Sequence, residues 1–97
     1  MAEAYIVDAV RTAGGKRKGA LTDWHPADMA GEVLNALTDR NPSLDPDAID
    51  DVIMGCVSQG GEQAFAFGRN AVLASRLPQS VPSVTIDRQC GSSQQAV

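Results

Sequence analysis

Residues 83–97 read SVTIDRQCGSSQQAV, and they carry the strongest indication of the fold class. Its first five residues, SVTID, have the β-branched, apolar pattern of a short strand that ends at Asp87. Cys90 follows, and Gly91-Ser92-Ser93 then lead into a helix-compatible run. The order predicts a strand that turns sharply into a helix. Cys90 is thereby placed at the carboxyl end of a strand, the edge where parallel sheets gather their ligand sites.

The next apolar segment upstream is DVIMGCVSQ, residues 51–59. Successive side chains of a strand point to opposite faces, and here both faces are apolar. One face carries Val52, Met54 and Cys56, and the other carries Ile53 and Val57. Strands of parallel sheets that are covered by helices have this pattern, so we expect a buried strand with Cys56 packed in the core.

Two stretches with helical periodicity accompany these strands. In residues 64–76, AFAFGRNAVLASR, three side chains share one face before the prolines of LPQSVP end the helix: Phe67, Ala71 and Ala74. An earlier helix is predicted to begin at Pro26 and to stop at Asn41-Pro42, with an apolar face made of Ala30, Val33, Leu34 and Leu37. Between them, DPDAID at residues 45–50 is expected to form at most a turn or two of helix.

Residues 4–10, AYIVDAV, are expected to form the first strand, buried on both faces. A glycine-rich loop, residues 13–23, separates this strand from the helix at Pro26. The order strand, helix, strand, helix, strand and helix start predicts an α/β fold whose sheet is at least partly parallel. The run from Gly91 to Val97 is too short for a stable helix, so we expect residues 1–97 to form an incomplete domain truncated at Val97.

Composition argues against several classes of function. The 97 residues carry 12 acidic and 8 basic side chains, and this net charge of −4 disfavours binding to nucleic acid or to an anionic membrane. The two cysteines and one histidine have no metal-ligand spacing and are too few for a disulfide framework. The sequence shows no membrane-spanning run and no export signal. We therefore expect a cytoplasmic protein without a metal that works on small molecules or contacts proteins.

Two charged features receive structural interpretations. Lys16-Arg17-Lys18 lies in the glycine-rich loop but lacks the spacing of a phosphate-binding loop, so it is interpreted as solvated surface. Contact with the anionic tail of a ligand is the alternative. His25 precedes the helix that begins at Pro26 and has no acid or nucleophile paired with it in sequence. We expect His25 to have a surface or helix-capping role.

Cys90 is the candidate nucleophile of this chain. At the start of a helix, unsatisfied N–H groups stabilise a thiolate, whereas Cys56 stands among aliphatic side chains. Topology alone leaves two interpretations of Cys90 open, a reactive thiol and a buried packing residue.

Three blocks of sequence together resemble the N-terminal part of a thiolase, an acetyl-CoA acyltransferase. They are VRTAGGKRKGAL (10–21), LDPDAIDDVIMGCVSQ (44–59) and GEQAFAFGRNAVLASRLPQSVPSVTIDRQCGSSQQAV (61–97). The blocks stand in the family's order and at its intervals, and they cover essentially the whole chain. The resemblance implies a thiolase-like fold, of which this chain is the first part of the N-terminal half.

The resemblance also implies a chemistry for Cys90. As the family's acyl-accepting cysteine, Cys90 would take the acyl group of a 3-ketoacyl-CoA as a thioester, release acetyl-CoA and pass the acyl group to coenzyme A, or run the reverse condensation. It implies no permanently bound cofactor, with coenzyme A and acyl-CoA as substrates, as in fatty acid β-oxidation. Homodimers or homotetramers are usual in the family. The activating histidine, a second cysteine and the main oxyanion donors come from later segments, so residues 1–97 alone are expected to be inactive.

Two features depart from the family pattern. Asp87 stands where the family usually has asparagine, serine or threonine, and a carboxylate there disfavours a thiolate unless a cation such as Arg88 pairs with it. Gln94 and Gln95 stand where the family usually has a pair that begins with an aliphatic residue. This glutamine pair resembles degradative thiolases that act on bulky acyl chains, sterol-derived ones included.

Three alternatives stay open beside the thiolase interpretation. One is a condensing enzyme of the 3-ketoacyl synthase type, against which the VIMG segment and the RTAGG loop argue. Another is a non-catalytic thiolase-like partner or lipid-binding subunit, against which the presence of Cys90 argues. The third is a small α/β domain without redox chemistry, since topology does not determine function.

Overall fold

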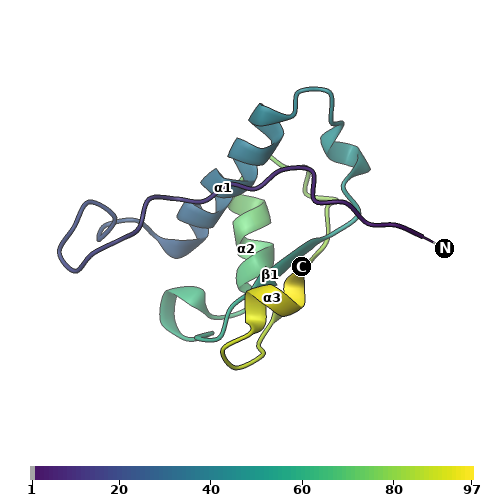
Figure 1. Ribbon diagram of the computed structural model, residues 1–97. Helices are drawn as coiled ribbons and strands as arrows, with labels where there is room; N and C mark the ends of the chain where they lie inside the picture. Colours follow the sequence, from purple (N-terminus) through teal and green to yellow (C-terminus); the bar gives the residue numbers. More distant parts are fainter. Residues whose placement is uncertain (1) are drawn as a thin grey trace.

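The computed structural model describes residues 2–97, and Figure 1 shows the course of the chain. Three α-helices, two strands and two short 3-10 turns follow one another in the described residues. In chain order they are α1 (Pro26–Arg40), η1 (Pro46–Ala48), β1 (Val52–Gly55), η2 (Gly61–Gln63), α2 (Phe67–Ala74), β2 (Ser83–Ile86) and α3 (Ser92–Ala96).

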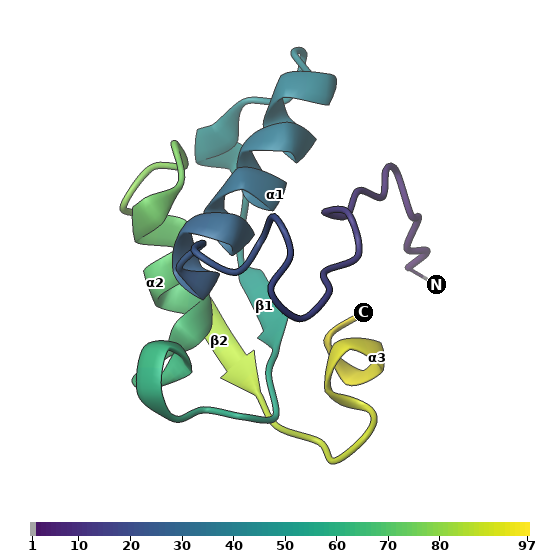
Figure 2. The same ribbon diagram turned by 90° about the vertical axis from the view of Figure 1, so that its left-hand side faces the viewer.

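The two strands are parallel neighbours joined through α2, which makes a strand-helix-strand unit. Their register pairs Val52 with Ser83 at one end and Gly55 with Ile86 at the other. Helices α1 and α2 lie on one side of the strands, and α3 lies on the other (Figure 2). The predicted α/β class with a parallel sheet is therefore confirmed, and so are the two strands that the sequence places around residues 52–55 and 83–86.

The core lies between α2, β1 and the segment that leads into β2. Val72 and Val81 are its most buried large side chains, with 0% and 2% of their surface exposed. Val52 and Leu77 complete the buried cluster. Burying an aliphatic side chain of this size contributes about 1.5–3 kcal/mol, so this small cluster supplies much of the local stability.

Helix α1 meets α2 through small side chains. The buried residues of α1 are Ala27, Gly31 and Asn35. A Cβ added at Gly31 would lie only 3.1 Å from the carbonyl of Ala74, so a larger side chain would push the helices apart. The four residues of the predicted apolar face are half-buried, and Leu34 among them packs against the core cluster; they are Ala30, Val33, Leu34 and Leu37.

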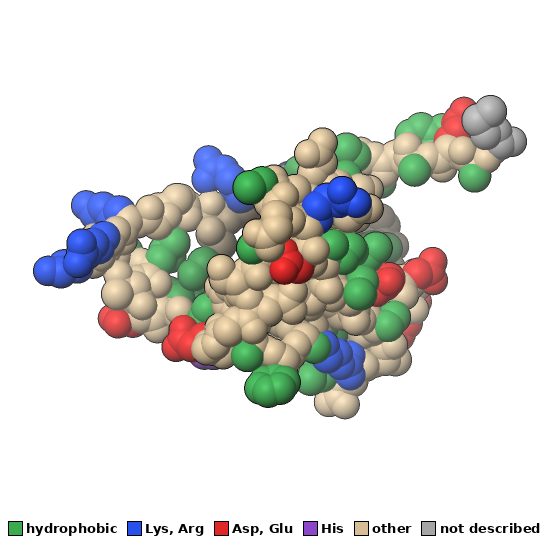
Figure 3. Space-filling model, turned by 90° about the horizontal axis from the view of Figure 1, so that it is seen from below, with side chains coloured by type: hydrophobic (Ala, Val, Ile, Leu, Met, Phe, Trp, Pro, Cys, Tyr) green, Lys and Arg blue, Asp and Glu red, His purple; other side chains and the backbone are tan. Residues whose placement is uncertain are grey.

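The predicted first strand is absent from the described residues. Tyr5, Ile6 and Val7 leave 77%, 82% and 83% of their surface exposed, and the segment extends from the body of the molecule (Figure 3). A strand exists through hydrogen bonds to a neighbour, and among residues 2–97 β1 pairs only with β2. The apolar pattern of residues 4–10 is not sufficient without such a partner, so this prediction is wrong.

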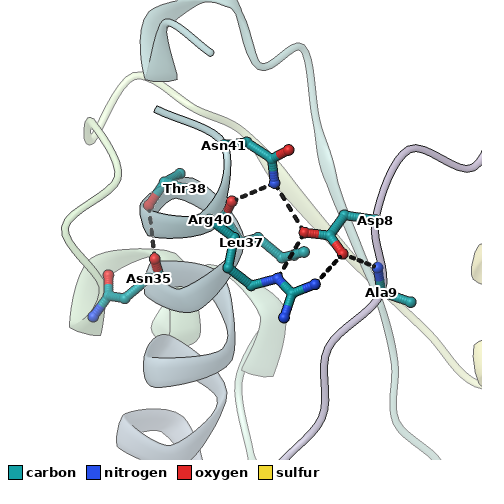
Figure 4. A network of polar contacts seen from close by, with 7 residues as sticks. All are labelled: Asp8, Ala9, Asn35, Leu37, Thr38, Arg40 and Asn41. Atoms are coloured by element: carbon teal, nitrogen blue, oxygen red, sulfur yellow. Dashed lines mark hydrogen bonds and ion pairs between the residues drawn. The ribbon is translucent and has the colours of Figure 1, made fainter. Parts of the chain in front are cut away.

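Asp8 holds this N-terminal segment against the end of α1 (Figure 4). Its carboxylate accepts two hydrogen bonds from the Arg40 guanidinium, each 2.9 Å long, and one from Asn41 Nδ2 at 3.0 Å. The Arg40 hydrogen bonds are the main reason that the pKa of Asp8 falls from 3.8 to about 2. An open, mainly apolar cavity of about 750 Å³ separates the segment from β1, with Ile6, Leu34 and Val52 in its lining.

The predicted helix over residues 64–76 is shorter in the structure. Phe65 and Ala66 adopt left-handed backbone angles, φ 55° and φ 56°, which a right-handed helix does not accommodate, so α2 begins at Phe67. Of the three residues placed on one face, Phe67 and Ala71 are buried and Ala74 is exposed. The short turn expected in DPDAID is confirmed by η1. No helix within residues 2–97 has the length and apolar character needed to cross a membrane.

Candidate functional site

Cys90 lies on the turn between β2 and α3, at the carboxyl end of the sheet. The turn closes with a hydrogen bond of 2.8 Å from the Gly91 N–H to the Arg88 carbonyl. Cys90 has a φ of +60°, a left-handed conformation that a residue with a Cβ adopts at a cost of about 1–2 kcal/mol. Cys90 is exposed to solvent. The turn therefore presents Cys90 outward instead of packing it in the core.

A buried hydroxyl holds this turn from within. Ser92 Oγ accepts a hydrogen bond from the Arg88 N–H at 3.0 Å and donates one to the Arg88 carbonyl at 2.9 Å. Ser92 is 7% exposed, and it is the buried residue of α3. One side chain thus connects the start of α3 to both backbone polar groups of the residue that opens the turn.

The start of α3 lies directly against β1. A Cβ built on Gly55 would be 2.4 Å from Ser93 N and 2.6 Å from the Ser92 carbonyl carbon. Real Cβ atoms do not approach backbone atoms so closely, so the glycine is what lets the chain after Cys90 settle on the sheet. The absence of a side chain at Gly55 therefore allows the backbone at Ser92 and Ser93 to approach β1 this closely.

The neighbours of Cys90 are polar. Asp87 accepts a hydrogen bond from Gln89 Nε2 at 3.1 Å, and within residues 2–97 its carboxylate makes no ion pair with Arg88. An open, polar hollow of about 640 Å³ lies beside the turn, lined by Arg88, Gly91, Gln94, Gln95 and Val97. Both glutamines are exposed, which agrees with polar side chains at these two positions.

Cys56 lies one residue beyond β1, and the prediction that it packs in the core is wrong. Its N–H donates to the Ile86 carbonyl at 2.9 Å, so the backbone continues the ladder, but its side chain is only half-buried. The Cys56 sulfur lies 3.5 Å from Gln63 Nε2 and 3.5 Å from the Ser58 carbonyl. The chain turns away after Gly55, so polar loop groups surround the thiol where a longer strand would have supplied aliphatic neighbours.

Thr85 connects β2 to the first turn of α2. The residue before α2, Ala66, has no side chain that could cap a helix. Thr85 Oγ1 instead accepts the hydrogen bond from the Gly68 N–H at 2.9 Å. This contact between strand and helix satisfies one of the free N–H groups at the helix start.

The other residues singled out by the sequence make no contact with this turn among the contacts described. His25 is the N-cap of α1, and its Nδ1 accepts a hydrogen bond from the Ala27 N–H at 3.1 Å, which confirms the capping role. Lys16, Arg17 and Lys18 are exposed, and Figure 3 shows basic side chains at the end of a projecting loop. Within residues 2–97 no cluster of three or more histidine, cysteine or acidic side chains is arranged to hold a metal ion.

The sequence predicted the position of Cys90 but not the contacts of three residues around it: Ser92 and Gly55, which hold the turn, and Thr85, which caps α2. The role of Thr85 depends on where α2 starts, and that of Ser92 depends on the path of the backbone from Arg88. Gly55 carried a usable signal, because a glycine inside an otherwise apolar strand often marks a close backbone approach.

These features define a class of protein: an α/β domain that presents a cysteine on a tight turn at the carboxyl edge of a parallel sheet. A comparison with family models identifies the family. The model for the N-terminal domain of thiolase matches residues 4–97, so the chain belongs to the thiolase family.

Individual relatives agree with this assignment. The chain is 55% identical over 97 residues to the steroid 3-ketoacyl-CoA thiolase FadA6 of Mycobacterium tuberculosis, covering 100% of this chain and 24% of that protein. It is 46% identical over 98 aligned positions to a 3-ketoacyl-CoA thiolase of Cronobacter sakazakii, with 100% and 25% coverage. The chain thus spans about a quarter of the length of these relatives.

A solved structure shows the same fold. The crystal structure of the Bacillus anthracis acetyl-CoA acetyltransferase superposes with a TM-score of 0.72 at 36% sequence identity. The match covers 84% of this chain and 20% of that one. The expected thiolase-like α/β fold is therefore confirmed.

Proposed function

We propose that this chain is part of a 3-ketoacyl-CoA thiolase in which Cys90 is the acyl-accepting nucleophile. The observation that carries the proposal is the exposed Cys90 on its left-handed turn, in a chain that belongs to the thiolase family over residues 4–97. The names of the relatives from Mycobacterium tuberculosis and Cronobacter sakazakii support the same reaction. Because those relatives are about four times longer, the activity is proposed for the intact protein that contains this chain.

The proposed reaction has two half-reactions. The Cys90 thiolate attacks the 3-keto carbonyl carbon of a 3-ketoacyl-CoA, and the bond between C2 and C3 breaks. The electron pair of that bond stays with C2, which takes up a proton and leaves as acetyl-CoA. The thiol of coenzyme A then attacks the thioester on Cys90, loses its proton and carries the shortened acyl group away. No permanently bound cofactor is needed in this scheme.

Cys90 is the one member of the catalytic set that we assign within this chain. His25 already uses Nδ1 to cap α1, and Cys56 makes its sulfur contacts inside the loop after β1. Neither is assigned as a base or acid. We propose that the base, the acid and the oxyanion donors that the reaction requires are supplied by other segments of the intact protein.

The acyl group is proposed to be bulky, and the direction degradative. Support comes from the 55% identity to a relative named for steroid 3-ketoacyl-CoA and from the exposed polar pair Gln94 and Gln95 beside the turn. The comparison that tests this point is kcat/KM for a sterol side-chain 3-ketoacyl-CoA against that for acetoacetyl-CoA. A preference for acetoacetyl-CoA would contradict it.

We also propose that the intact protein is a homodimer or homotetramer and works in the cytoplasm. Ile53 and Val84 are direct neighbours in the strand register, and each leaves 45% of its surface exposed on the α3 side of the sheet. Both cysteines are free, which fits a reducing compartment. Light scattering of the intact protein measures the oligomeric state, and a monomeric mass would contradict the first part.

Substitution of the two cysteines tests the assignment of Cys90. In the intact protein, Cys90→Ser is expected to lower kcat for thiolysis by at least about 1,000-fold, because an alcohol is a far weaker nucleophile than a thiolate at neutral pH. The matched control, Cys56→Ser, is expected to keep kcat within about threefold, because Cys56 takes no part in the scheme. Undiminished turnover of Cys90→Ser would remove Cys90 from the mechanism.

A further inference from the structure

The turn that carries Cys90 depends on one side chain. Between β2 and α3 the chain reverses direction over residues 88–91, and the only backbone hydrogen bond closing it among the described residues is that from Gly91 to Arg88. Ser92 adds two more, one to the Arg88 N–H at 3.0 Å and one to the Arg88 carbonyl at 2.9 Å. The hydroxyl therefore makes two of the three hydrogen bonds that close the turn.

The conformation of Cys90 needs this support. A φ of +60° is unfavourable for a residue with a side chain, and such conformations persist only where the surroundings impose them. Cys90 itself is exposed, so packing of its own side chain does not impose it. The constraint comes from the residues on either side, Arg88 and Ser92.

A second contact holds the same turn from the sheet. The peptide between Ser92 and Ser93 lies on Gly55, so close that an added Cβ would be 2.4 Å from Ser93 N. Ser92 is thus held between β1 and the backbone of Arg88, with 7% of its surface exposed. Its hydroxyl is buried and bonded to both backbone polar groups of Arg88, so it constrains the path of the chain through Cys90.

We propose that Ser92 is a positioning residue for the nucleophile: its hydroxyl holds the turn of residues 88–92 so that Cys90 keeps its left-handed backbone and its thiol keeps one direction. The inference rests on the proposed role of Cys90 and adds a residue that acts through it. In this proposal the buried Ser92 acts through the backbone of Arg88 and is not itself a catalytic residue. A misplacement of a reacting group by about 1 Å can cost about 100-fold in rate, so the loss of this hydroxyl is expected to be visible in kcat.

The test compares Ser92→Ala with Ser93→Ala in the intact protein. Ser93 is the exposed neighbour, whose side chain makes no hydrogen bond among the described residues, so it is a matched control. Ser92→Ala is expected to lower kcat by about 10- to 100-fold with KM within about threefold, and to slow iodoacetamide alkylation of Cys90 across the pH profile. Ser93→Ala is expected to change both by less than about twofold.

A pair of equal size separates the hydroxyl from the packing. Ser92→Thr adds a methyl group and keeps the hydroxyl. Ser92→Val adds the same methyl group and has a second methyl group in place of the hydroxyl, so the two variants are nearly equal in size. Ser92→Thr is expected to be about 10-fold more active than Ser92→Val. This pair also serves if Ser92→Ala does not fold. Equal kcat and equal alkylation rates in the two variants would overturn the proposal, as would a lower melting temperature of Ser92→Ala with unchanged kcat.

The outcome also separates this proposal from the one on which it rests. If Cys90→Ser is inactive while Ser92→Ala behaves like Ser93→Ala, only the positioning role is overturned. If Cys90→Ser remains active, the role of Cys90 is overturned and the positioning role falls with it. Loss of activity in Cys90→Ser together with the graded loss in Ser92→Ala supports both.

Discussion

Two apolar stretches of this chain have similar sequences, but one forms a paired strand and the other is exposed. VIMG at residues 52–55 pairs with a parallel neighbour and is covered by α2 on one face and α3 on the other. YIV at residues 5–7 is just as apolar, yet it leaves more than three-quarters of its surface exposed. The difference shows that strand formation depends on a hydrogen-bonding neighbour and a covering helix, and that β-branched composition supplies neither.

The largest expected effect comes from truncating the same residue type in the two regions. Val72 of α2 is 0% exposed, so Val72→Ala in the intact protein is expected to cost about 2 kcal/mol through lost burial and the cavity left behind. Val7→Ala is the matched control; Val7 is 83% exposed, and a change of less than about 0.5 kcal/mol is expected. Hydrogen exchange of the α2 amides measures both. Equal effects would show that residues 5–7 are packed as well as the core.

An intermediate effect concerns the contact that holds the N-terminal segment. The pKa of Asp8 is lowered from 3.8 to about 2 in the folded chain, chiefly by the hydrogen bonds from Arg40. A lowered pKa means that the contact contributes its full stability above pH 3.8 and loses it as the pH falls through about 2. The carboxyl signal of Asp8, followed by NMR, is expected to titrate near pH 2. In Arg40→Gln it should move back toward 3.8; a titration that ignores this substitution would show that Arg40 is not the cause.

The smallest effect is a gain in stability at the start of α2. Ala66 has a φ of +56°, which glycine adopts without strain, so Ala66→Gly is expected to stabilise the intact protein by about 0.5–1 kcal/mol. Ala64 has an ordinary φ of −74°, and Ala64→Gly is the control, expected to be neutral or slightly destabilising. Urea unfolding of the two variants measures the difference. A destabilised Ala66→Gly would mean that the methyl group makes a contact worth more than the backbone strain.

Local signals in the sequence account for the parts of the fold that were predicted. The N-cap at His25, the short turn in DPDAID and the change from strand to helix around Cys90 each depend on a few neighbouring residues. The absent strand at residues 4–10 depends on a partner elsewhere in the chain, which periodicity does not report. The half-buried position of Cys56 follows from β1 ending at Gly55, two residues before the apolar pattern ends at Val57.

At the candidate site, too, one part could be predicted from the sequence and another could not. Cys90 could be found because its position follows from the order of strand, turn and helix. The hydroxyl of Ser92 could not, because its two bonds to Arg88 depend on the turn's three-dimensional path. The close contact between Gly55 and Ser93 could not be predicted either, because it depends on where α3 lies relative to β1.

Trapping the acyl-enzyme tests directly whether Cys90 carries the acyl group. The intact protein is incubated with acetoacetyl-CoA in the absence of free coenzyme A, quenched in acid, digested and analysed by mass spectrometry. The expected result is an acetyl thioester on the peptide that contains Cys90, removed when coenzyme A is added before the quench. An acyl group found on Cys56, or release of acetyl-CoA with no acyl group on Cys90, would contradict this assignment.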